Sequence, residues 1–172
     1  KKQGMKLYTA LFIIFQTAFT FTGYCQPDSL LINERTPSWA KNVLVKSELF
    51  GNYTILDDLN PFYFEVDLNG DDLTDIVLRV KHKLTGDVGI FVINGGKNLC
   101  FVMGAGKPIG MGSNIDWCNK WFIFRDKAIY NFDSKKVKTV IRTPGIELRK
   151  TDSKSVIIYW DRRKYIAKIK ST

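Results

Sequence analysis

The stretch IVLRVKHKLTGDVGIFVI, residues 76–93, decides the fold class. It holds two runs of β-branched and aromatic residues, 76–80 and 88–93, and the second run follows the turn residues Thr85-Gly86-Asp87. Apolar runs bounded by turn chemistry are typical of β-strands. Because a parallel crossover needs a dozen or more residues, a connection this short predicts two antiparallel strands.

Similar short runs recur over most of the chain. They cover residues 53–56, 62–66, 99–103, 121–124, 128–132, 137–142, 146–148, 155–160 and 165–169. Most are joined by short turns, such as Asp161-Arg162-Arg163-Lys164. We therefore expect a mainly β fold, an antiparallel meander of hairpins that forms either one large twisted sheet or two packed sheets. The segment Thr36-Pro37-Ser38-Trp39 predicts one short N-terminal helix near residues 37–48, because proline suits the first helical position.

Residues 1–25 have the features of a secretory signal peptide and its upstream residues. Met5-Lys6 supplies a positive start, and the apolar run 7–21 is shorter than the roughly 20 residues that span a bilayer. We expect cleavage before Gln26. The alternatives are an uncleaved membrane anchor and a lipoprotein cut before Cys25. The prediction is export to the periplasm, the cell surface or the medium.

The mature chain, residues 26–172, is predicted to be a single β-rich domain with no membrane span. Its two cysteines, Cys100 and Cys118, leave two alternatives open. In an oxidising compartment they would form a disulfide that closes a loop of about 18 residues. Otherwise they are buried free thiols, because cysteine packs well inside β cores.

Positive charge is concentrated near the end of the chain. The formal net charge is +9, and residues 134–172 hold 12 basic and 3 acidic side chains. Such a region can contact polyanions, although a solvated lysine-rich face is the plainer interpretation. The chain has no dedicated nucleic-acid motif.

The sharpest chemical signal is DLNGDDLTD, residues 67–75. Oxygen donors at positions 1, 3 and 5, a backbone carbonyl at position 7 and a carboxylate at position 9 suit a hard cation of the size of Ca²⁺. The alternative is a solvated acidic turn. The predicted calcium ligands are Asp67, Asn69, Asp71, the carbonyl of Leu73, and Asp75.

With Ile76-Val77-Leu78 after it, this loop resembles the D-x-D/N-G-D-G-x-x-D segment of FG-GAP and VCBS-type repeats. The resemblance implies a calcium site with the same five ligands, although Asp72 stands where the family usually has glycine. One copy argues against a propeller, which needs about four blades or more. The segments Ile93-Asn94-Gly95-Gly96, Gly104-Ala105-Gly106-Lys107 and Tyr159-Trp160-Asp161 also resemble small exported proteins of Bacteroidetes type, a likeness that implies no activity.

Catalytic motifs are weak in this sequence. The single histidine, His82, lies between two lysines and has no second histidine with which to form a zinc site. Gly104-Ala105-Gly106-Lys107-Pro108 lacks the Ser or Thr of a phosphate loop. We expect a non-enzymatic, calcium-stabilised module that binds a protein or a glycan at the cell envelope. The alternatives are an inhibitor or immunity protein against a toxin or lytic enzyme, and a hydrolase with an unassigned site.

Overall fold

The computed structural model describes part of the chain. The described residues are 35–47, 49–97, 99–109, 112–130, 137–151 and 155–170. The predicted signal peptide at residues 1–25, with the cut before Gln26 and the alternative at Cys25, lies outside the described residues.

The expected mainly β fold is confirmed. In chain order the described elements are α2 (Ser38–Lys46), the 3-10 turn η1 (Phe50–Asn52), β1 (Tyr53–Leu56), β2 (Tyr63–Val66), β3 (Asp75–His82), β4 (Val88–Ile93), β5 (Cys100–Gly104), β6 (Lys120–Phe124), β7 (Ala128–Tyr130), β8 (Val137–Val140), β9 (Gly145–Arg149), β10 (Ser155–Trp160) and β11 (Tyr165–Lys170). Every pair of these strands is antiparallel, as the short connections predict.

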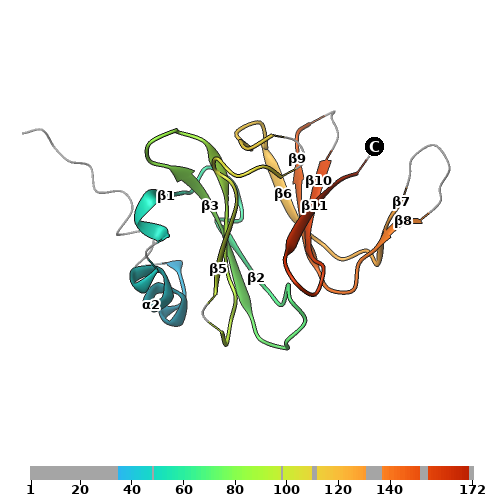
Figure 1. Cartoon of the computed structure of the whole chain (residues 1–172), viewed down its shortest axis with the longest axis horizontal. Coiled ribbons are helices and arrows are strands. Elements are labelled where there is room, and N and C mark those ends of the chain that lie inside the picture. Colours follow the sequence, from blue (N-terminus) through green and yellow to red (C-terminus); the bar gives the residue numbers. More distant parts are fainter. Residues whose placement is uncertain are drawn as a thin grey trace, which may run out of the picture.

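Of the two arrangements expected, the structure has two packed sheets. The first has the order β1-β3-β4-β5, with β2 also paired to β3, and the second has the order β11-β10-β9-β6. Strands β7 and β8 form a separate hairpin. Figure 1 shows the layers in sequence, from α2 through the first and second sheets to the β7–β8 hairpin.

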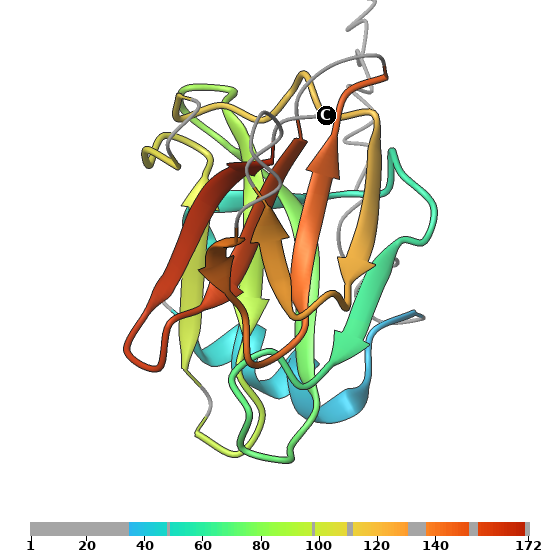
Figure 2. The ribbon, with the colours of Figure 1, turned by 90° about the vertical axis from the view of Figure 1, so that its right-hand side faces the viewer.

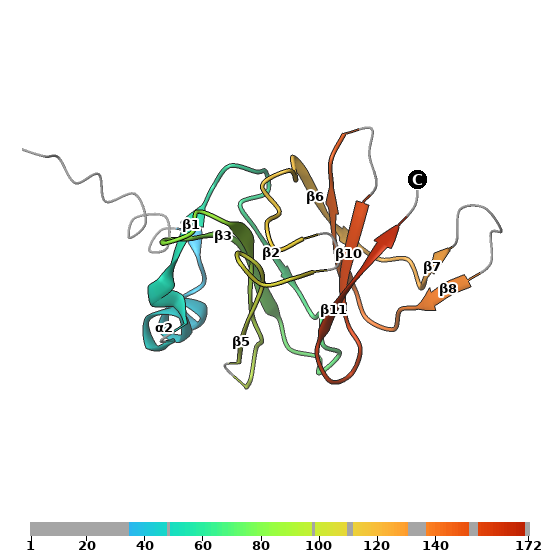
Figure 3. The same ribbon diagram turned by 45° about the horizontal axis from the view of Figure 1, so that its top comes forward.

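The topology departs from a simple meander where β1 and β2 pair with the same strand, β3. Strand β1 pairs with residues 79–82 of β3, and β2 pairs with residues 75–78 of the same strand. The two strands therefore follow one another along a single edge of β3, and the connection at residues 57–62 leaves the sheet between them. Figure 3 shows β1 and β2 beside β3.

The strands β3 and β4 are buried because both faces of the first sheet are covered. Ile76 and Leu78 pack in a cluster with Ala40 and Leu44 of α2, whereas Val77 packs toward the second sheet. An antiparallel strand with one wet face would alternate apolar and polar residues. The apolar run at 88–93 and the run at 76–80, which only Arg79 interrupts, therefore reflect a helix on one side and a sheet on the other.

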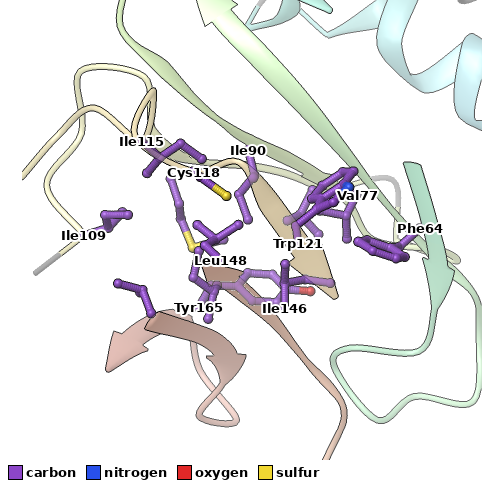
Figure 4. Packing of buried hydrophobic residues seen from close by; sticks show 14 of the residues in the cluster. Phe64, Val77, Ile90, Ile109, Ile115, Cys118, Trp121, Ile146, Leu148 and Tyr165 are labelled. Atoms are coloured by element: carbon purple, nitrogen blue, oxygen red, sulfur yellow. The ribbon is translucent and has the colours of Figure 1, made fainter. Parts of the chain in front are cut away.

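The core between the sheets includes Trp121 of β6, which is 2% exposed (Figure 4). Its ring lies 4.5 Å from that of Phe64, centroid to centroid, and its indole Nε1 donates to the carbonyl of Pro61 at 2.9 Å. Cys118 is buried in the same cluster and Cys100 is half-buried. Both cysteines are free thiols, so the disulfide alternative is not formed in this structure.

The helix begins at Ser38, one residue later than expected, with Pro37 at the N-cap position. It ends at Lys46, and a 3-10 turn at Phe50–Asn52 follows it. None of the described helices is both long enough and apolar enough to cross a membrane.

Candidate functional site

The acidic loop at residues 67–75 connects β2 to β3. Val66 pairs with Asp75, so the sheet holds both ends of the loop together. Asp67 organises the tip, because one carboxylate oxygen accepts hydrogen bonds from the amides of Gly70 and Asp71 at 2.6 and 3.3 Å, and the other accepts from the amide of Asp72 at 3.0 Å. The tip therefore folds around a single carboxylate.

The backbone of the tip is left-handed at two positions, Gly70 with φ of 77° and Asp72 with φ of 62°. Asp72 is the residue that replaces the glycine of the resembled segment. Asp visits this backbone region more readily than most residues other than glycine. The replacement therefore keeps the conformation that glycine would allow.

Asn69 and Asp71 are joined inside the loop. The side-chain oxygen of Asn69 accepts from the amide of Asp71 at 2.9 Å, and the side-chain amide of Asn69 donates to the carboxylate of Asp71 at 3.1 Å. The other carboxylate oxygen of Asp71 accepts from the amide of Leu73 at 3.1 Å. The side-chain oxygens of Asn69 and Asp71 thus accept hydrogen bonds from amides of the loop itself.

Asp75 lies behind the loop and is fully buried. Its two carboxylate oxygens accept from the amides of Leu68 and Gly95 at 2.8 and 2.9 Å. Burial raises the pKa of Asp75, the two amide hydrogen bonds oppose that rise, and the negative charges of Asp71 and Asp67 add to it. The negative charges of Asp67 and Asp71 therefore disfavour the ionised form of the buried Asp75.

A residue from the end of the chain completes this interior. The hydroxyl of Tyr165, on β11, donates to the side-chain oxygen of Asn94 at 2.8 Å. Burial raises the pKa of Tyr165 far above its usual range, and the nearby carboxylates of Asp75, Asp67 and Asp71 raise it further. Nothing in the sequence pattern linked Tyr165 to the acidic loop, which lies about 90 residues earlier in the chain.

The predicted calcium ligands are therefore neighbours, but they do not form a finished cage. Their carboxylate and amide oxygens are of the type that Ca²⁺ prefers, and a carboxylate oxygen that accepts one amide still has a second lone pair. Among the described residues, however, no group of three histidine, cysteine, aspartate or glutamate side chains is placed to hold a metal ion. The donor chemistry fits calcium, whereas the side chains are arranged here for hydrogen bonding within the loop.

A groove of about 680 Å³ opens beside the tip of the loop. Three connections form its walls: the loop tip at Asn69 and Gly70, the β8–β9 connection with Arg142 and Thr143, and the β10–β11 turn. The loop and the turn lie at the same end of the molecule (Figure 2). The hydroxyl of Thr143 donates to the carbonyl of Leu68 at 2.7 Å, which ties the β8–β9 connection to the acidic loop.

Close approach of these two connections requires glycine at position 70. A Cβ added to Gly70 would lie 2.8 Å from the methyl group of Thr143, closer than real Cβ contacts. The same residue also has a positive φ, which glycine adopts without steric cost. Gly70 therefore shapes the loop and also brings it against the groove.

The β10–β11 turn supplies the basic wall of the groove with Arg162 and Arg163. The carboxylate of Asp161 accepts from the amides of Arg163 and Lys164 at 3.0 and 2.9 Å, which fixes the turn. These two hydrogen bonds outweigh the effect of burial and lower the pKa of Asp161, and the charges of Lys164 and Arg163 add a smaller effect in the same direction. Asp161 thus stays ionised as part of the turn.

The arginines of this groove were not singled out by the sequence pattern, which showed only an excess of basic residues at 134–172. The paired arginines at the centre of a hairpin turn were the one local signal available. Comparisons of the chain with family models, with curated proteins and with solved structures find no match.

Proposed function

We propose that this protein is an exported β-sandwich module, stabilised by Ca²⁺ at residues 67–75, that binds a protein or glycan at the cell envelope without catalysing a reaction. The observation that carries the proposal is that the tip of the acidic loop and three arginines line one groove. A cation in the loop and a ligand in the groove would then act on the same end of the molecule.

Charge repulsion supports the calcium part of the proposal. Asp67 and Asp71 lie close enough to the buried Asp75 for their negative charges to disfavour its ionised form. A bound cation would relieve this repulsion, and the unfolded chain does not gather the three carboxylates. A ligand that binds only the folded chain adds about 2.7 kcal/mol to the free energy of unfolding when it is present at a hundred times its Kd.

The side chains of the groove support a role in binding. Arginine keeps its proton at neutral pH and offers five N–H donors in a planar arrangement that matches oxyanions. The carboxylate of Asp161 is held by two amides of its own turn. The groove therefore presents permanently charged hydrogen-bond donors rather than a side chain that gains and loses a proton near neutral pH.

Thermal unfolding in the presence of calcium, magnesium or chelator tests the proposal. We expect calcium to raise the melting temperature and magnesium to substitute poorly, because Mg²⁺ demands a smaller octahedral shell. Asp71→Asn should remove most of the calcium-dependent rise while keeping an oxygen for the amide of Leu73. Asp72→Gly is the matched control, since it also removes one negative charge from the loop but leaves the predicted ligands intact and suits the φ of 62°.

Two results would contradict the calcium site. One is a wild-type melting temperature that chelator does not change, together with no heat of calcium binding by calorimetry. The other is an equal loss of calcium response in Asp71→Asn and Asp72→Gly, which would indicate general attraction of a cation to an acidic turn.

A further inference from the structure

We propose that the groove binds an anionic oligosaccharide whose carboxylate or sulfate groups are spaced along the chain, and that Arg142, Arg162 and Arg163 hold those groups. This inference deepens the proposed function by naming the ligand class. It rests on the residues of the groove and does not require calcium in the loop.

The first argument is that the three guanidinium groups form no ion pair with the residues that the structure describes. Arg142, Arg162 and Arg163 are exposed, and none forms an ion pair with a described residue, although Asp161 lines the same groove. The ion pairs that the described residues do form join Arg79 to Asp58, and Arg149 and Lys170 to Glu147. The concentrated positive charge of the groove is therefore left for an external anion.

The second argument is the backbone of Arg162, which has φ of 80°. The left-handed region costs a residue with a Cβ roughly 1–2 kcal/mol, and glycine would occupy it without that cost. An arginine at this position reduces the stability of the turn. Backbone strain of this kind is concentrated at binding and catalytic sites, where the side chain is needed for function.

The third argument concerns the kind of anion. Guanidinium groups bind carboxylates, sulfates and phosphates through paired hydrogen bonds. Trp160, which is half-buried, also lines the groove. Its ring makes edge contacts with the rings of Phe101 and Tyr165 at centroid distances of 5.8 and 4.8 Å. An aromatic ring beside polar side chains suits a ligand that has both an apolar face and hydroxyl groups, as a sugar ring does.

The acidic loop argues against a densely charged polymer. Asp67, Asp71 and Asp72 flank the loop tip that forms one wall of the groove, and Asp161 lies within the groove. Like charges at close range repel, so an uninterrupted phosphate backbone would meet carboxylates next to the arginines. A saccharide whose charges are separated by neutral rings can place its anionic groups on the arginines alone.

Calorimetric titration of the full chain tests the inference with four probes of similar length: a κ-carrageenan tetrasaccharide with sulfates on alternate rings, a hyaluronan tetrasaccharide with carboxylates on alternate rings, neutral maltotetraose and a short polyphosphate. We expect the charged saccharides to bind, with affinity that falls as salt rises, and to exceed both maltotetraose and polyphosphate. Comparison of the sulfated probe with the carboxylated probe identifies which anion the arginines prefer.

Arg162→Gly is the decisive variant, because it removes the guanidinium and also relieves the strained backbone. It should weaken saccharide binding by about tenfold or more, the loss expected for a charge-assisted hydrogen bond. Its melting temperature should equal or exceed that of the wild type. Lys168→Gln is the control, since it removes one exposed positive charge from the same part of the chain outside the groove.

Several outcomes would overturn the inference. These are equal binding of maltotetraose or polyphosphate, an unchanged affinity in Arg162→Gly, or an equal loss of affinity in Lys168→Gln. None of them affects the calcium response of the melting temperature, so failure of the ligand class is distinguishable from failure of the calcium site.

Discussion

The ion pair between the buried Arg79 and Asp58 allows a quantitative test of how each partner contributes to the free energy of unfolding. Arg79, on β3, is 1% exposed, and its Nε and Nη2 atoms donate to the two carboxylate oxygens of Asp58 at 2.9 and 2.8 Å. Its third nitrogen, Nη1, is buried and has no hydrogen-bond partner in the structure described. The guanidinium is therefore only partly compensated for its removal from water.

This arrangement predicts an asymmetry between the two partners. Removal of one partner of a buried pair costs about 3–5 kcal/mol, because a charge is left buried alone. The side chain of Asp58 is 47% exposed, so water can reach part of the site, and we expect Asp58→Ala to cost about 2–3 kcal/mol. Arg79→Met removes the buried charge and its unpaired nitrogen, and should stay within about 1 kcal/mol of the wild type.

Urea unfolding followed by circular dichroism measures both variants. For a domain of this size, the cost of Asp58→Ala corresponds to a fall of about 5–10 °C in melting temperature. The double variant should match Arg79→Met alone, and Asp57→Ala, at the exposed neighbouring position, should change the free energy by less than about 0.5 kcal/mol. If Arg79→Met proves as costly as Asp58→Ala, the pair is a net stabiliser and the reasoning is wrong.

Two further predictions concern the sheets. Burial alone would raise the pKa of Glu147, but the hydrogen bond from Arg149 and the charges of Lys170 and Arg149 outweigh burial and lower it. A lowered carboxylate pKa adds stability above the unfolded-state pKa, and that stability is lost as pH falls through the folded-state value. Glu147→Gln should therefore cost about 1–3 kcal/mol at neutral pH in urea melts, and this difference should shrink as pH falls through the folded-state pKa of Glu147. A difference that is the same at neutral and at strongly acidic pH would contradict the assignment. A Cβ on Gly89 would lie 2.5 Å from the backbone nitrogen of Ala105 and from the carbonyl oxygen of Met103. Gly89→Ala should therefore destabilise by about 1–3 kcal/mol, whereas Gly51→Ala, with open space around it, should not; equal thermal stability of the two variants would refute this.

Strand positions were largely predictable because their signals are local. The runs at 53–56, 88–93 and 155–160 coincide with β1, β4 and β10. Apolar runs and turn residues act within a few positions of the chain, so they mark strands before any tertiary contact is known. The same signals do not say which strands pair, and β6 pairs with β9 across the excursion of the β7–β8 hairpin.

The burial of two charged residues on β3 could not be predicted from that pattern. Asp75 and Arg79 share the face of β3 that carries Val77, which points between the sheets. One of the two donors to Asp75 comes from Gly95, and the acceptor of Arg79 is Asp58, each about 20 residues away in sequence. A charged residue in a strand is buried only where such partners meet it, and distant pairing decides where that happens.

By itself the sequence determined a mainly β chain, the positions of most strands, and an acidic loop at 67–75 with calcium-type donors, because strand propensity, turn chemistry and a nine-residue motif are all properties of short segments. Only the tertiary structure decided that two sheets pack face to face and that Arg142, Arg162 and Arg163 meet the tip of that loop in one groove. The groove joins residues from 69 to 163, and contacts over such separations depend on which strands pair rather than on any local pattern.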